Sequence, residues 1–127
     1  MKKKISDIVA EFLVKKGFSH AFGVTGGGAM HLNDSFSNNK KIKFIHTHHE
    51  QTAAMAADSY FRQKRVPAIV HTTSGPGGTN AITGVIGSWV DSFFCAFLSA
   101  FSKVFKSSFA CLWCIALMEI KLGFLDF

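Results

Sequence analysis

The chain has 127 residues, of which 48% are hydrophobic and 17% charged, and its formal net charge is +6. This length and composition fit one globular domain with a hydrophobic core and exclude a disordered chain. The basic residues fall in short separate clusters without a groove-reading or aromatic pattern, so we predict no nucleic-acid partner. Acidic residues interrupt the segment after the lysine-rich start, which excludes a signal peptide and favours the cytoplasm.

Predicted helices and strands alternate through the first 92 residues. Helices are expected at residues 5–16, 29–36, 50–64 and 79–90, and strands at 20–24, 42–46 and 67–73. Gly17 is a natural end for the first helix. The alternation predicts an α/β fold with a doubly wound, mostly parallel sheet that is flanked by helices and incomplete at its C-terminal end.

Three turns follow the carboxyl ends of the predicted strands. They cover residues 25–28, 47–50 and 74–78, and two of them are rich in glycine. Ligands of such sheets bind outside the carboxyl ends of the strands. We therefore expect the three turns to converge on one site.

The glycine-rich turns do not match the common nucleotide-binding motifs. His31 and Asn80 occupy the third glycine position of a dinucleotide fingerprint, and Ala29 stands where a phosphate-binding loop needs lysine. Two interpretations stay open for these glycines, close backbone approach to a ligand and ordinary tight turns.

Glu50 ends a run of polar residues at the beginning of an alanine-rich helix. The preceding histidines suggest a metal site, but Ala53 stands where a His-Glu-x-x-His motif needs its second histidine, so we disfavour metal. Two interpretations of Glu50 remain. It either stabilises the first turn of its helix or directs a carboxylate into the crevice at the strand ends.

Four segments together resemble a known family. They are Phe-Gly-Val-Thr-Gly-Gly at 22–27, His-Glu-Gln-Thr-Ala-Ala-Met-Ala-Ala-Asp-Ser-Tyr at 49–60, Thr-Ser-Gly-Pro-Gly-Gly-Thr-Asn at 73–80, and Asp-Ser at 91–92. Their order and spacing resemble the N-terminal, pyrimidine-binding domain of acetolactate synthase-like thiamine-diphosphate enzymes. We assign residues 1–92 to this domain.

The resemblance implies a cofactor and a site. Glu50 matches the glutamate that hydrogen-bonds N1′ of the aminopyrimidine of thiamine diphosphate and so promotes loss of the C2 proton of the thiazolium. The family decarboxylates 2-keto acids and transfers the acyl unit. Asn80 is expected to cap or steady the helix after its turn. The cofactor-binding residues implied are Thr25, Gly26, Gly27, Glu50, Thr73, Ser74, Gly75, Pro76 and Asn80.

Residues 93–127 form a divergent tail. A strand is still expected near residues 95–98, and the resemblance to the family is lost after it. The proline, glycine and active-site glutamine of the relatives are missing, and we interpret this hydrophobic tail as frameshifted. Lys103 and Lys106 interrupt it, so we predict no membrane span. The CxxC spacing of Cys111 and Cys114 is attributed to chance, because no second ligand pair accompanies it.

The family holds the diphosphate and Mg²⁺ with another domain, through a Gly-Asp-Gly motif that this sequence lacks. We therefore expect half a site, in a truncated chain that is inactive alone. A homo-oligomer or a complementing diphosphate-binding domain would supply the other half. The alternatives are a split subunit that completes a site in trans and a defective fragment.

Overall fold

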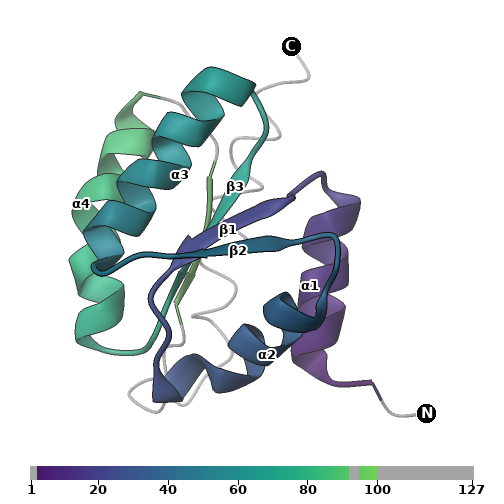
Figure 1. The fold of residues 1–127 in the computed structure, drawn as a ribbon. Helices are drawn as coiled ribbons and strands as arrows, with labels where there is room; N and C mark the ends of the chain where they lie inside the picture. Colours follow the sequence, from purple (N-terminus) through teal and green to yellow (C-terminus); the bar gives the residue numbers. More distant parts are fainter. Residues whose placement is uncertain (1–2, 92–94, 100–127) are drawn as a thin grey trace.

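The structure is a computed structural model, and it describes residues 3–91 together with the backbone of residues 95–99. Four parallel strands form one sheet in the order β2-β1-β3-β4. The helices α1 and α2 lie on one side of this sheet and α3 and α4 on the other (Figure 1). The strands are β1 (His20–Gly23), β2 (Lys43–His46), β3 (Ala68–Thr72) and β4 (Cys95–Ser99). The helices are α1 (Ile5–Lys15), the 3₁₀ turn η1 (Gly27–Ala29), α2 (Met30–Asn38), α3 (Glu50–Lys64) and α4 (Pro76–Val90).

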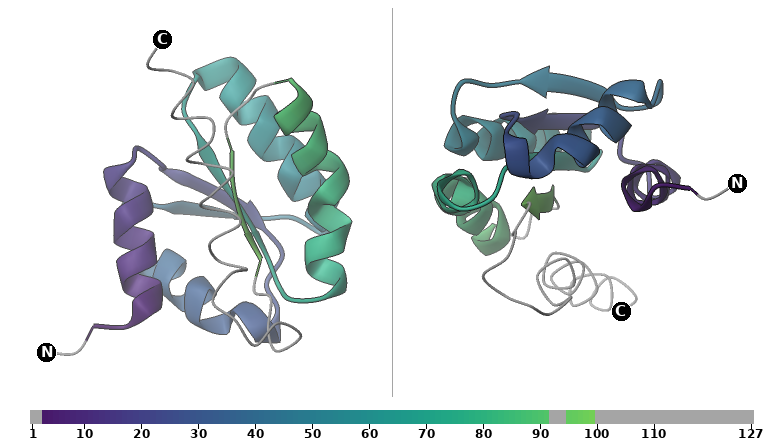
Figure 2. Two further views of the ribbon diagram at one scale, coloured as in Figure 1. Left: turned by 180° about the vertical axis from the view of Figure 1, so that it is seen from behind. Right: turned by 90° about the horizontal axis from the view of Figure 1, so that it is seen from below.

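This arrangement confirms the predicted doubly wound α/β fold. Helices cover both faces of the sheet (Figure 2). The chain passes from β2 to β3 across β1, so β1 lies between β2 and β3 in the sheet. The expected strand near residues 95–98 is confirmed as β4, which pairs with β3. The boundary predicted after Ser92 stays a prediction, and the interpretation of residues 100–127, with the CxxC pair, lies outside the described residues.

The central strands are buried on both faces. Ala21 of β1 packs with α1 and α2, whereas its neighbour Phe22 packs with α3 and α4. In β3, Ile69 and Val70 divide in the same way. Successive side chains of a strand point to opposite faces, so a doubly covered strand has a continuous run of buried residues. All five residues of β3 are buried for this reason.

The end of α1 follows its local sequence. Gly17 adopts a φ of +90°, a conformation that favours glycine. The N–H of Phe18 donates to the carbonyl oxygen of Leu13 at 3.0 Å, and that of Gly17 donates to Val14 at 3.0 Å, which is the pattern of a Schellman motif. Phe18 and Leu13 are both buried in the same cluster. The predicted stop at Gly17 is confirmed.

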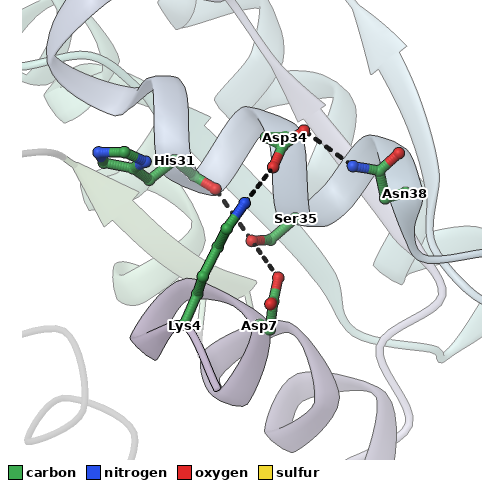
Figure 3. Close-up of polar contacts among 6 residues, drawn as sticks. All are labelled: Lys4, Asp7, His31, Asp34, Ser35 and Asn38. Carbon is green, nitrogen blue, oxygen red and sulfur yellow. Dashed lines mark hydrogen bonds and ion pairs between the residues drawn. The ribbon is translucent and has the colours of Figure 1, made fainter. Parts of the chain in front are cut away.

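Polar contacts join α1 to α2 (Figure 3). The hydroxyl of Ser35 donates to Oδ1 of Asp7 at 2.7 Å, and Nζ of Lys4 lies 3.0 Å from Oδ2 of Asp34. The ion pair is exposed and contributes little, whereas Ser35 is buried and its bond is shielded from water. These contacts fix α2, the helix that directly follows the first glycine-rich turn.

The beginning of α4 differs from the prediction. The helix begins at Pro76 rather than near residue 79, so the turn after β3 is shorter than expected. Proline suits the first turn of a helix because that position has no intrahelical partner for an N–H. Gly77 and Gly78 have low helix propensity, but both are buried in this first turn. Tertiary packing therefore overrides the local turn signal.

Candidate functional site

The site lies where β1 and β3 end side by side. The chain leaves β1 toward β2 on one side and reaches β3 on the other side through α3. In sheets with this connectivity, ligands bind outside the carboxyl ends of the strands, at the point where the strand order reverses. Residues 25–28 leave β1 and residues 73–75 leave β3 at this point. The convergence expected for these two turns is therefore observed.

The two turns pack closely because particular positions have no side chain. A Cβ atom on Gly26 would lie 2.5 Å from Cβ of Thr73, and one on Gly28 would lie 2.6 Å from Oγ of Ser74. A side chain on Gly26 would collide with the branched Cβ of Thr73, so this position needs glycine for the first turn to rest on the second. A side chain on Gly28 would require the Ser74 hydroxyl to rotate away.

Other glycines of the same turns face open space instead. A Cβ atom on Gly27 or Gly75 would meet nothing within 4 Å among the described residues. Gly75 also has a φ of +69°, which favours glycine. Thr25 and Pro76 are exposed residues beside them. At these two positions the turns therefore expose backbone with no neighbouring side chain against it.

Glu50 is the first residue of α3, and the residue before it caps the helix. Nδ1 of His49 accepts the N–H of Gln51 at 3.1 Å, and the hydroxyl of Thr47 donates to the carbonyl oxygen of His49 at 3.0 Å. The cap leaves the Glu50 side chain available for another contact, while its charge still benefits from the helix N-terminus.

The Glu50 carboxylate reaches across to α4. Nδ2 of Asn80 donates to Oε2 of Glu50 at 3.1 Å. A Cβ atom on Gly77 would lie 3.3 Å from Oε1 of Glu50 and 2.8 Å from Cγ2 of Thr73. Glu50 is half-buried and Asn80 is exposed, so this contact lies at the surface end of the packed helices rather than in the core. Glu50 begins its helix, and its carboxylate contacts α4, the helix that follows the turn after β3. Its role toward a ligand stays a prediction.

Asn80 does not cap the helix after its turn. The helix α4 begins four residues earlier, so Asn80 lies inside it and only the alternative role of steadying that helix stays open. An interior asparagine often turns its side chain toward the backbone. Here its amide is directed to Glu50, because α3 and α4 pack side by side.

Sequence reasoning missed one pair of residues behind the site. His71 of β3 is fully buried, and its Nε2 lies 2.5 Å from Oδ1 of Asn33 on α2. Phe36 and Phe44 meet the imidazole edge-on at centroid distances of 5.4 and 5.7 Å. Burial lowers the pKa of His71 to about 4. The only sequence signal was a histidine within an otherwise apolar strand.

Comparison with known proteins gives the family. The family model described as the thiamine pyrophosphate enzyme, N-terminal TPP binding domain, matches residues 3–107. The chain therefore belongs to this family, and the resemblance inferred from the motifs is confirmed.

Several similar curated proteins are acetolactate synthases. The acetolactate synthase large subunit of Buchnera aphidicola subsp. Acyrthosiphon pisum is 38% identical over 87 residues, which cover 68% of this chain and 15% of that protein. The Haemophilus influenzae large subunit is 38% identical over 92 residues, which cover 71% of this chain and 16% of that protein. The chloroplastic enzyme of Arabidopsis thaliana is 33% identical over 90 residues, which cover 71% and 13%. The chain thus matches only about 15% of the length of these relatives.

Proposed function

We propose that this chain binds the aminopyrimidine half of thiamine diphosphate as the N-terminal domain of an acetolactate synthase-like enzyme, with Glu50 as the carboxylate that activates the cofactor. One observation carries the proposal. The Glu50 carboxylate lies against Asn80 and Gly77, at the edge where the two glycine-rich turns meet. Family membership supports the choice of cofactor.

The residues present fit an aminopyrimidine ring. The ring is flat and needs backbone that approaches it without side chains, which Gly27 and Gly75 supply on the open side of their turns. It also carries nitrogen atoms that need a carboxylate within hydrogen-bonding reach, and Glu50 is the acidic residue of these turns. Thr73 and Ser74 line the wall between the turns.

Bound thiamine diphosphate would supply the nucleophilic carbon for decarboxylation of a 2-keto acid and acyl transfer. The protein would hold the proton that this chemistry needs at the Glu50 carboxylate. Glu50 is half-buried, and the neutral amide of Asn80 adds no positive charge beside its carboxylate.

The proposal includes a second half of the site from elsewhere. Mg²⁺ and the diphosphate would be held by another domain, in a homo-oligomer or in a complementing chain, because the Gly-Asp-Gly motif is missing here. The exposed position of Asn80 agrees with a site whose other wall is supplied by a partner. Cytoplasmic localisation stays a prediction. Among the described helices, none is long and apolar enough to cross a membrane.

The test is a titration of the 127-residue chain with thiamine diphosphate and Mg²⁺, followed by backbone amide NMR. We expect a Kd on the order of 1 mM, since half a site retains only part of the contacts. Signals of residues 25–28 and 73–80 should shift, and Glu50→Gln should remove most of the effect. The control is Glu11→Gln, which removes an exposed carboxylate paired with Lys3 on α1.

Two results would contradict the proposal. Shifts confined to the lysine clusters would show nonspecific binding of the diphosphate, and unchanged shifts in Glu50→Gln would exclude Glu50 from the site. Micromolar binding by wild type would contradict the claim that the chain holds half a site.

A further inference from the structure

Asn80 and Glu50 lie 30 residues apart, on two neighbouring helices, and their side chains form one hydrogen bond of 3.1 Å. We infer that Asn80 is a positioning residue that selects one orientation of the Glu50 carboxylate, and that the packing of α3 on α4 sets the distance between the two. The inference rests on the proposed function, in which that carboxylate faces the pyrimidine ring.

The bond divides the two carboxylate oxygens between different tasks. Asn80 holds Oε2, and because a carboxylate is planar, this contact also fixes the direction of Oε1. Oε1 lies next to Gly77, where even a Cβ atom would approach it to 3.3 Å. One oxygen is therefore anchored, while the other lies beside Gly77, where no Cβ atom intervenes between it and the backbone and Thr73 is the neighbouring side chain.

An amide suits this task better than a cation. Asparagine donates a hydrogen bond without adding charge, so Glu50 keeps its full negative charge for a ligand. A lysine or arginine at position 80 would form an ion pair and compete with the ligand for the same carboxylate. The choice of residue therefore agrees with positioning rather than neutralisation.

The distance between the two side chains depends on a contact one helical turn further along. Ala54 follows Glu50 by four residues, and Gly84 follows Asn80 by four, so each pair lies on one face of its helix. A Cβ atom on Gly84 would lie 2.6 Å from Cβ of Ala54. The helices thus touch backbone to side chain at this level, and that approach brings Asn80 within reach of Glu50.

The experiment measures the order of the Glu50 side chain in the full 127-residue chain. Three-bond NMR couplings report whether χ1 of Glu50 occupies one staggered rotamer or averages over several. We compare wild type with Asn80→Leu, which keeps a similar volume without the donor. The matched control is Asn38→Leu, since Asn38 is also exposed and donates to Asp34 at 2.8 Å, away from the site.

We expect one Glu50 rotamer in wild type and in the control, and averaging in Asn80→Leu. The unfolding midpoint in urea should stay the same in Asn80→Leu, because residue 80 is exposed. Gly84→Ala should also release Glu50, although it leaves Asn80 in place. Titration with thiamine, which carries the pyrimidine without the diphosphate, should show roughly tenfold weaker binding to Asn80→Leu than to wild type, as expected for losing one hydrogen bond to a charged group.

The outcomes separate this inference from the proposed function. The inference is overturned if χ1 of Glu50 has the same rotamer distribution in wild type and in Asn80→Leu, whatever the thiamine titration gives. It is also overturned if both chains bind thiamine with the same measurable affinity. If Glu50 is ordered in wild type and released in Asn80→Leu while neither chain binds thiamine, the positioning role stands and the proposed function fails.

Discussion

The buried histidine behind the site makes the stability of this fold sensitive to mild acid. His71 is 0% exposed, and its Nε2 lies 2.5 Å from Oδ1 of Asn33. An amide oxygen accepts hydrogen bonds only, so the neutral ring carries its proton on Nε2. A second proton would have to enter at Nδ1, a buried atom that has no hydrogen-bond partner within residues 3–91. Protonation is therefore costly in the folded state.

The size of the effect follows from the two pKa values. Burial lowers the pKa of His71 from 6.5 to about 4 in the folded chain. Between these values the unfolded chain binds the proton and the folded chain does not, so the free energy of unfolding falls as the pH falls from 6.5 toward 4. At 1.36 kcal/mol per pH unit, His71 alone removes about 2 kcal/mol between pH 7.5 and pH 5. That is a large part of the stability of a small domain.

The measurement is urea unfolding of the chain at several pH values from 7.5 to 5, compared with His71→Gln. Glutamine can still donate to Asn33 but does not titrate, so the variant should lose about 2 kcal/mol less than wild type over this range. The comparison is needed because His20 contributes in the same direction. Its pKa is lowered by partial burial and by the charge of Lys43.

An identical pH dependence in wild type and His71→Gln would refute this reasoning. It would mean that the imidazole is hydrated or paired in the folded chain. An NMR titration that places the pKa of His71 near 6.5 would lead to the same conclusion.

Three further predictions concern contacts between helices and between turns. Gly84→Ala should overpack α4 against α3, which lowers the free energy of unfolding in urea by about 1–3 kcal/mol. The higher helix propensity of alanine offsets about 1 kcal/mol of this loss. An increase in stability would contradict the close contact. Gly26→Ala should displace the first turn from Thr73 and weaken thiamine binding in an NMR titration, whereas unchanged binding would show that the turns need not touch. Ser35→Ala should cost about 1 kcal/mol in the same urea assay through loss of its part-buried hydrogen bond to Asp7. Asp7→Asn keeps an acceptor for that bond and should cost less.

The local sequence predicts the elements of this fold well where the signals are short-range. The helix from Glu50 to Lys64 begins and ends as expected, because alanine and other small residues favour helix and polar residues precede it. Gly17 ends α1 because its positive φ is a local property. The order of helices and strands also implied the parallel sheet, since a parallel pair needs a crossover and the helices supply it.

Motif order predicted the family and the position of Glu50, but not the contacts that Glu50 makes. The partner of its carboxylate is Asn80, 30 residues later, and spacing along the chain does not report which side chains meet across two packed helices. The predicted beginning of α4 near residue 79 was also wrong, because the burial of Gly77 and Gly78 in the first turn outweighs their low helix propensity.

The sequence by itself therefore determined the class of fold and the family, and it predicts a site at the strand ends with Glu50 as its acidic residue. The fold class follows from periodicity, whereas the prediction for Glu50 follows from motifs that resemble the family. Only the tertiary structure decided that Asn80 holds Glu50, that Gly26 rests on Thr73, and that His71 is buried beside Asn33. Such contacts depend on how closely elements approach one another in space, and that distance is set by packing over the whole domain.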